Sequence, residues 1–283
     1  MEDKITFMRY IRLYALYAKM DFAWLLRDTT FALISIVSDV ISNIAAVTGV
    51  FLLAWRFDGI GGMDKYEVLL MLAYSTVITG IFQLFFSGNN TGHISRRIGR
   101  GQFEHMFIQP IPIKSQLLTE GFIPFSGSSN LISGIVIMCI AVSNLGITVT
   151  WWWVLSVIGN LIVTIVIILA QSYLYSSLAF YAPVQAEEIS SYVIDAAGQI
   201  SSFPLSGMPL YLQMPLITII PSGLLAWFPT LTLLGKPPLG MSEMFPLIIA
   251  IIFSILATIF FKKGLNYYVK KGSNRYSARG YRR

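Results

Sequence analysis

Residues 131–142, LISGIVIMCIAV, form an apolar run that decides the class of fold. The run lacks the alternation of apolar and polar residues at every second position that a strand of a transmembrane barrel would show. In lipid, the backbone polar groups of a spanning segment have to be satisfied within that segment, so the run is predicted to be helical. The sequence therefore predicts an all-α integral membrane protein.

The composition of the rest of the chain agrees with this prediction. Of the 283 residues, 55% are hydrophobic and 12% are charged, whereas a soluble domain carries about 25% charged residues. A bilayer core of about 30 Å requires roughly 20 apolar residues of helix. On this basis we predict six transmembrane helices, at residues 31–55, 66–86, 120–145, 151–181, 189–203 and 244–262.

The distribution of Lys and Arg predicts the orientation of these helices. Three segments are rich in Lys and Arg, with five in 1–30, four in 87–119 and eight in 262–283. The segments between them are poor in these residues, with two in 56–65 and one in 204–243. Lys and Arg favour the cytoplasmic side of a membrane. We therefore expect both termini to be cytoplasmic, with residues 29–283 forming one transmembrane domain that ends in a basic cytoplasmic tail, 263–283.

The apolar segment 204–232 is expected to be broken rather than straight. Its prolines recur every five to eight residues, and proline removes a backbone donor and kinks a helix. We predict short re-entrant helices that enter the outer leaflet and return. The alternative is that one kinked span elsewhere in the chain is misassigned. A full crossing would place the basic tail outside. The prolines that break this segment include Pro204, Pro209, Pro215 and Pro221.

The N-terminal segment 1–28 has the pattern of an amphipathic helix. Apolar residues recur at steps of three and four to form one stripe: Phe7, Ile11, Tyr14, Ala18, Phe22 and Leu25. The basic residues of the helix fall on the opposing side: Arg9, Arg12, Lys19 and Arg27. A helix with one basic and one apolar face lies in the membrane interface, and we predict that position here. The alternative is a helix packed on a soluble core.

A short basic segment, 93–118, separates the second and third predicted spans and contains RRIGRGQFEHMFIQPIPIKSQLL at 96–118. Gly101 permits a tight turn, and Pro110 disfavours helix at the residue before it. Between them GQFEHMFIQ is expected to form about two helical turns. Phe103, Met106 and Phe107 would then share one face, apolar toward a partner, with Glu104, His105 and Gln109 available to another surface.

This segment resembles the intracellular loop of ABC transporter permeases of the type-2 export superfamily. In that family a string of the form G-x-[LF]-[DE]-x-x-[LF]-x-x-P carries the coupling helix. Here the string is Gly101, Phe103, Glu104, Phe107 and Pro110, with His105 and Met106 inside it. The later run SSFPLSGMP, followed by LITIIPSGLLAWFPTLTLLG, resembles the outer segment of the same family, with phenylalanine in place of its usual tyrosine.

The resemblance implies a six-helix permease in a prokaryotic cell membrane that pairs with a second permease, identical or different, and with two cytoplasmic ABC ATPase subunits. The coupling helix would dock on the ATPase, and the interfacial helix would touch it. The re-entrant outer segment would help to close the external gate, with Pro204, Pro209, Pro215 and Pro221 as its candidate residues. ATP and Mg²⁺ would be bound by that partner, because this chain has no G-x-x-x-x-G-K-[ST] string and no cofactor is expected on it. The expected activity is export of an amphiphilic cargo, such as a drug-like molecule, a peptide or a lipid.

Two acidic residues within predicted spans, Asp39 and Asp195, leave a second interpretation open. Intramembrane charges face a bundle interior or a watery path, so these two are candidates for the translocation path or gate, or for the ion sites of an ion-coupled carrier or channel. A neutral acid that holds two helices together is an equal alternative. An intramembrane enzyme is disfavoured because the sequence offers no nucleophile and base pair.

Two further binding activities are not expected. His93 and His105 are twelve positions apart and are not predicted to bind a metal. The basic tail is expected to contact anionic membrane lipid rather than nucleic acid.

Overall fold

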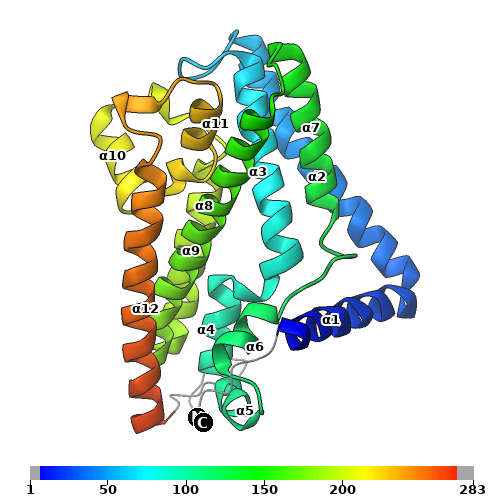
Figure 1. Ribbon diagram of the computed structural model, residues 1–283, viewed down its shortest axis with the longest axis vertical. Helices are drawn as coiled ribbons and strands as arrows, with labels where there is room; N and C mark the ends of the chain where they lie inside the picture. Colours follow the sequence, from blue (N-terminus) through cyan, green and yellow to red (C-terminus); the bar gives the residue numbers. More distant parts are fainter. Residues whose placement is uncertain (1–6, 273–283) are drawn as a thin grey trace.

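The computed structural model describes residues 7–272, apart from the side chains at positions 114, 190, 191, 194 and 195. Of the described residues, 80% are helical and none belongs to a strand. The long helices run side by side along the vertical axis of Figure 1. The all-α prediction is therefore confirmed. The first six residues and most of the predicted basic tail, 273–283, lie outside the described residues.

Four helices are long and apolar enough to cross a membrane. They are α2 (Thr29–Arg56), α3 (Lys65–Phe86, continued by short helices to Gly99), α8 (Trp151–Ser176) and α12 (Phe245–Lys271). A fifth span is present among the described residues if the bent pair Leu210–Thr218 and Ser222–Leu233 is counted as one broken span. The other two predicted spans correspond to α7 (Ser129–Leu145), an apolar helix of 17 residues, and α9 (Pro183–Ile200), of 18 residues. Length and composition thus support four of the six predicted spans, those that correspond to α2, α3, α8 and α12, and do not support α7 and α9 as spans.

The predicted start of the third span, at residue 120, is wrong. Residues 120–128 form turns and extended chain, and α7 begins only at Ser129. The sequence there, EGFIPFSGS, contains two glycines and a proline, and Gly121 adopts a left-handed φ of 93°. Such residues favour turns over helix, so the apolar phenylalanines of this segment belong to a connection.

Helices α3 and α7 pack with their backbones in close approach. A Cβ atom added at Gly80 would overlap the backbone of Leu131, and one added at Gly134 would lie 2.7 Å from the backbone nitrogen of Val77. Small residues permit such approach between membrane helices, where dispersion contacts replace the hydrophobic effect as the driving force. The two glycines therefore determine how closely this helix pair can pack.

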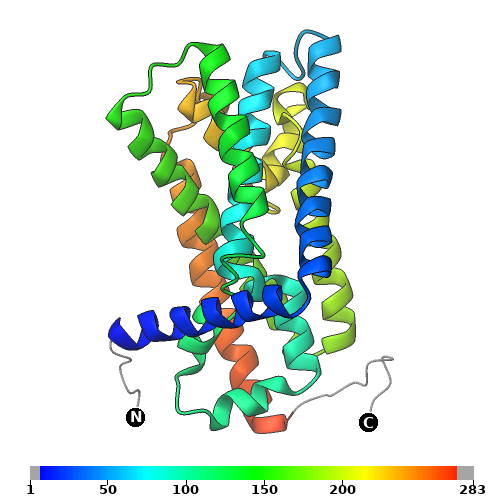
Figure 2. The same cartoon turned by 90° about the vertical axis from the view of Figure 1, so that its right-hand side faces the viewer.

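Short helices gather at one end of the bundle, which we call the loop end. They are η1 (Ser87–Asn89), α4 (Thr91–Gly99), α5 (Gln102–Ile108), α6 (Ile113–Thr119) and η2 (Ser177–Phe180). Helix α1 (Phe7–Arg27) lies across the bundle at the same end, roughly perpendicular to the long helices (Figure 2). The predicted N-terminal helix is present, and its orientation is the one an interfacial helix requires.

The opposite end, which we call the proline end, holds the residues predicted to be re-entrant. They form η3 (Leu205–Gly207), α10 (Leu210–Thr218), η4 (Ser222–Leu224) and α11 (Trp227–Leu233), followed by η5 (Pro238–Gly240). The two halves of this segment meet at a bend of 74°, as in a broken span or a re-entrant loop. Pro204, Pro209 and Pro221 each precede one of these short helices, and Pro215 lies within α10.

Candidate functional site: the loop end and a cavity within the bundle

Helix α5 begins and ends where its glycine and proline predict. Gly101 lies at its N-cap in the left-handed conformation, with φ 73° and ψ 16°, which glycine adopts without steric cost. Gln109 is extended, with φ −78° and ψ 144°, as expected for a residue that precedes proline. The predicted two-turn helix is therefore confirmed, over Gln102–Ile108.

The apolar face of α5 turns inward and packs on the protein itself. Phe103 is fully buried and Met106 is 7% exposed. They belong to a group that we call the loop cluster: Ile94, Ile98, Phe103, Met106, Leu117, Ala179, Phe180, Ala186 and Tyr268. The Phe103 ring lies 5.8 Å from that of Phe180 and 6.4 Å from that of Tyr268, centroid to centroid. The expectation that Phe103 and Met106 face a partner is therefore wrong, because α5 uses these side chains to fill this chain's own core.

The C-terminal tip of α5 presents the apolar surface that remains. Ile108 is 81% exposed, and Phe107 is 42% exposed with one ring face stacked on Tyr268. His105, Gln109 and Pro110 are also exposed, and Glu104 is half-buried. Phe107 was predicted from the sequence and Ile108 was not, because the 3.6-residue pattern does not determine which face of the helix is turned outward.

Two ion pairs join the loop end to the rest of the bundle. Arg97 on α4 donates from Nη1 to Glu120 Oε2 at 2.8 Å, and Arg96 donates from Nε to Glu187 Oε1 on α9 at 2.9 Å. These pairs were not predicted, since their members lie 23 and 91 positions apart. Their partly exposed carboxylates make each pair a positioning contact worth about 1 kcal/mol or less.

Helix α1 is fastened to the same loop. Arg9 donates from Nη2 to the Pro110 carbonyl at 3.3 Å, and the Tyr10 hydroxyl lies 2.7 Å from Ser115 Oγ. Burial raises the pKa of the Tyr17 phenol, and the nearby Glu120 carboxylate raises it further. The phenol therefore stays neutral against the Arg97–Glu120 pair. The remaining predicted basic residues of α1, Arg12, Lys19 and Arg27, are exposed.

Asp21 is the most buried residue of α1, at 7% exposure, and it forms an anchor that the sequence analysis missed. Its Oδ2 accepts hydrogen bonds from the backbone N–H groups of Phe125 and Ser126, at 2.8 and 3.2 Å. Its Oδ1 accepts one from Ser126 Oγ at 2.6 Å. A single carboxylate thus holds α1 against the connection that leads into α7.

We expect Asp21→Ala to lower stability markedly. The substitution leaves two N–H donors without their acceptor, and a charge-assisted hydrogen bond contributes about 1.5–3 kcal/mol. Scanning fluorimetry of the purified protein in detergent should show a transition temperature several degrees lower. Glu243→Ala, at an exposed carboxylate of the proline end, is the control and should leave the transition unchanged. An unchanged transition in Asp21→Ala would show that the anchor carries no stability.

An open-sided cavity of about 650 Å³ lies between α2, α3, α8 and the end of α9. Amide and hydroxyl side chains from each of these helices line it, and they include Asn43, Gln83, Gln171, Ser172 and Gln199. Ser172 is 1% exposed, and its Oγ has no hydrogen-bond partner among the described residues. No Asp, Glu, Lys or Arg is among the described residues that line the cavity. It can therefore accept a neutral molecule or group that forms hydrogen bonds.

The residues predicted to form the path are not brought together at this cavity. Asp39 is exposed on α2, and its carbonyl accepts a hydrogen bond from Asn43 Nδ2 one turn later. Asp195 lies on α9, and its side chain is outside the described part of the structure. The four predicted prolines lie at the proline end and are not among the lining residues described. Within the described residues there is also no cluster of His, Cys, Asp and Glu that could hold a metal ion.

Comparison with known proteins gives one match, to a family. Residues 40–272 match the model of the family described as ABC-2 family transporter protein. No curated protein and no solved structure matches the chain. Members of this family are permeases, membrane subunits without a nucleotide-binding domain of their own that work with an ATPase partner. The chain is therefore a multi-pass membrane protein that belongs to the ABC-2 family of transporter proteins.

Proposed function

We propose that this chain is the permease subunit of an ATP-driven exporter, and that the cavity between α2, α3, α8 and α9 receives an amphiphilic cargo. The observation that carries the proposal is this cavity in an ABC-2 permease, whose described lining combines a largely apolar wall with uncharged amides and hydroxyls. A drug-like molecule, a peptide or a lipid can place neutral hydrogen-bonding groups against its amides and hydroxyls, and its apolar part against the surrounding helices.

In this proposal the loop end faces the cytoplasm and receives the ATPase. The exposed tip of α5 is the docking surface, and α1 lies in the membrane interface beside it with its basic side chains toward lipid headgroups. Helices α7 and α9 complete a set of six spans, α10 and α11 form a re-entrant outer gate, and both termini are cytoplasmic. A second permease, identical or different, completes the path in a prokaryotic cell membrane.

The cavity can be tested by filling it. Gly198 lines the cavity, and no atom lies within 4 Å of a Cβ added there, so Gly198→Leu adds bulk without a clash. Gly159, on α8, has the same open surroundings and lies away from the cavity, so Gly159→Leu is a matched control. Both substitutions also remove a helical glycine, which makes their effects on helix propensity equal.

The measurement is ATP hydrolysis by the permease reconstituted with its ATPase, with fluorescent amphiphilic dyes and short-chain phospholipids as cargo. We expect Gly198→Leu to lower the cargo-stimulated rate several-fold and to leave the basal rate unchanged, while Gly159→Leu behaves as the wild type. If both variants keep full stimulation, the cavity is not the cargo site. If transport of the dyes proceeds without any ATPase, the exporter proposal fails.

A further inference from the structure

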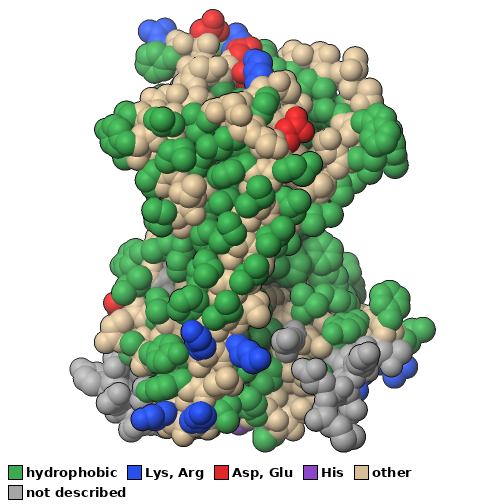
Figure 3. Space-filling model, turned by 60° about the vertical axis from the view of Figure 1, so that its left-hand side comes forward, with side chains coloured by type: hydrophobic (Ala, Val, Ile, Leu, Met, Phe, Trp, Pro, Cys, Tyr) green, Lys and Arg blue, Asp and Glu red, His purple; other side chains and the backbone are tan. Residues whose placement is uncertain are grey.

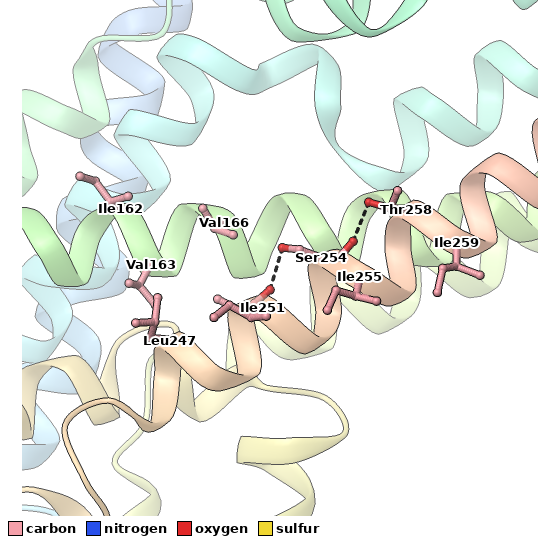
Figure 4. A pocket seen from close by; sticks show the side chains of 10 residues that line it. Ile162, Val163, Val166, Leu247, Ile251, Ser254, Ile255, Thr258 and Ile259 are labelled. Carbon is pink, nitrogen blue, oxygen red and sulfur yellow. Dashed lines mark hydrogen bonds between the residues drawn. The ribbon is translucent and has the colours of Figure 1, made fainter.

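A groove on the surface of the bundle, between α8 and α12, is separate from the central cavity. Its volume is about 450 Å³, and three residues of α8 form one wall: Ile162, Val163 and Val166. The other wall is formed by α12. Figure 4 shows the labelled side chains along the two neighbouring helices.

The wall on α12 consists of two rows in which residues recur every four positions. One row is Leu247, Ile251, Ile255 and Ile259; the other is Ala250, Ser254 and Thr258. Residues four apart lie one above the other on a helix, so each row forms a continuous ridge. From Leu247 to Ile259 the groove extends about 18 Å at 1.5 Å per residue, comparable with the roughly 15 Å of one leaflet of hydrocarbon.

The two hydroxyl groups in the groove are already used by the helix. Ser254 Oγ donates to the Ala250 carbonyl at 2.7 Å, and Thr258 Oγ1 donates to the Ser254 carbonyl at 2.8 Å (Figure 4). Both donors are therefore satisfied, and the remaining lining residues are aliphatic. An aliphatic chain fits this groove better than a polar ligand, since a polar ligand would lose its hydrogen bonds to water.

Each ridge of α12 continues into a lysine. Four positions after Ile259 and Thr258 come Lys263 and Lys262, and both side chains are exposed. The structure gives neither lysine an ion pair with a described residue, and Lys263 Nζ lies 5.9 Å from the Phe260 ring centroid. Figure 3 shows the same arrangement on a larger scale: the middle of this face is hydrophobic, and Lys and Arg side chains gather at its lower end.

We propose that this groove is a binding site for an anionic phospholipid. One acyl chain lies along the groove, and the phosphate lies against Lys262 and Lys263. The commitment to an anionic lipid rests on charge complementarity: two cations without acidic partners stand where an apolar groove of about one leaflet's length ends. The assignment to the cytoplasmic leaflet rests on the orientation proposed above, whereas binding itself does not depend on the ATPase or on transport.

The test is native mass spectrometry of the full-length chain in detergent, with phosphatidylglycerol or phosphatidylcholine of identical acyl chains. We expect more phosphatidylglycerol than phosphatidylcholine to be retained. The double variant Lys262→Gln/Lys263→Gln should remove this preference, at about fivefold per lysine. The control Lys270→Gln/Lys271→Gln changes two lysines of the same helix beyond the groove and should keep the preference.

A second variant tests the groove rather than the charges. Ile255→Trp fills its centre, and we expect it to lower retention of both lipids. The proposal is overturned if the wild type retains the two lipids equally, or if both double variants behave alike. It is also overturned if Ile255→Trp converts a dimer of this chain to a monomer with lipid binding unchanged, since the groove would then be an interface between two copies. None of these outcomes bears on ATP hydrolysis, so they are distinct from failure of the exporter proposal.

Discussion

Ile108→Asp is expected to abolish coupling to the ATPase while the permease folds normally. The side chain is 81% exposed at the tip of α5, so a carboxylate there stays in water when the chain is alone and costs little stability. In a complex, the same carboxylate would be buried in an apolar contact without a partner. Loss of a central apolar contact typically costs 2 kcal/mol or more, which is roughly 30-fold in affinity.

The measurement for Ile108→Asp is co-purification of the ATPase with the tagged permease, followed by cargo-stimulated ATP hydrolysis. Phe57→Asp is the matched control, because Phe57 is a 73% exposed apolar residue at the opposite end of the bundle. We expect the control to retain the ATPase and its stimulation. Full assembly and full stimulation in Ile108→Asp would exclude the tip of α5 as the docking surface.

Phe103→Ala is expected to cause the largest loss of stability of any substitution considered. Phe103 is fully buried, and its ring meets the rings of Phe180 on η2 and of Phe261 and Tyr268 on α12. Replacing a core phenylalanine with alanine costs about 3–5 kcal/mol through lost burial and the cavity that remains. Since this ring connects α5 with η2 and α12, its loss loosens the whole loop end.

Thermal unfolding in detergent, together with protease accessibility of residues 100–112, would measure this effect. Phe57→Ala is the control, and its exposed ring should be removable with little change. A stable Phe103→Ala protein with an intact loop end would mean that the loop cluster does not hold α5 in place. Loss of ATPase binding in this variant would not identify a contact residue, because the docking surface would itself be displaced.

The helical class of the fold and the positions where helices end or break could be predicted from the sequence, because both depend on local chemistry. The apolar runs require helices in lipid, Gly101 and Pro110 delimit α5, and the prolines of 204–232 break that segment. The amphipathic pattern of α1 likewise predicted its helix, and the family resemblance drawn from the loop and outer strings agrees with the family match.

The direction in which each face points could not be predicted, because it depends on distant partners. Phe103 and Met106 form an apolar stripe that fits a partner's groove as well as this chain's own core, and only Phe180 and Tyr268, more than 70 positions away, decide between the two. Asp21 gave no signal either, since its three hydrogen-bond donors lie 104 and 105 positions away. The two acids predicted to line the path were singled out by their charge, whereas the polar groups in the described cavity wall are neutral amides and hydroxyls among apolar side chains.

The close packing of α3 on α7 has a consequence for how the cavity can change shape. Because a Cβ at Gly80 or Gly134 would overlap the other helix, the two backbones are in close contact at the crossing, and we expect α3 and α7 to move together. A change that opens or closes the cavity therefore has to come from its other sides. Helix α2 is the best candidate for this movement, because only 6% of its most apolar window is buried. It can therefore shift relative to α3 and α7 with the loss of few contacts.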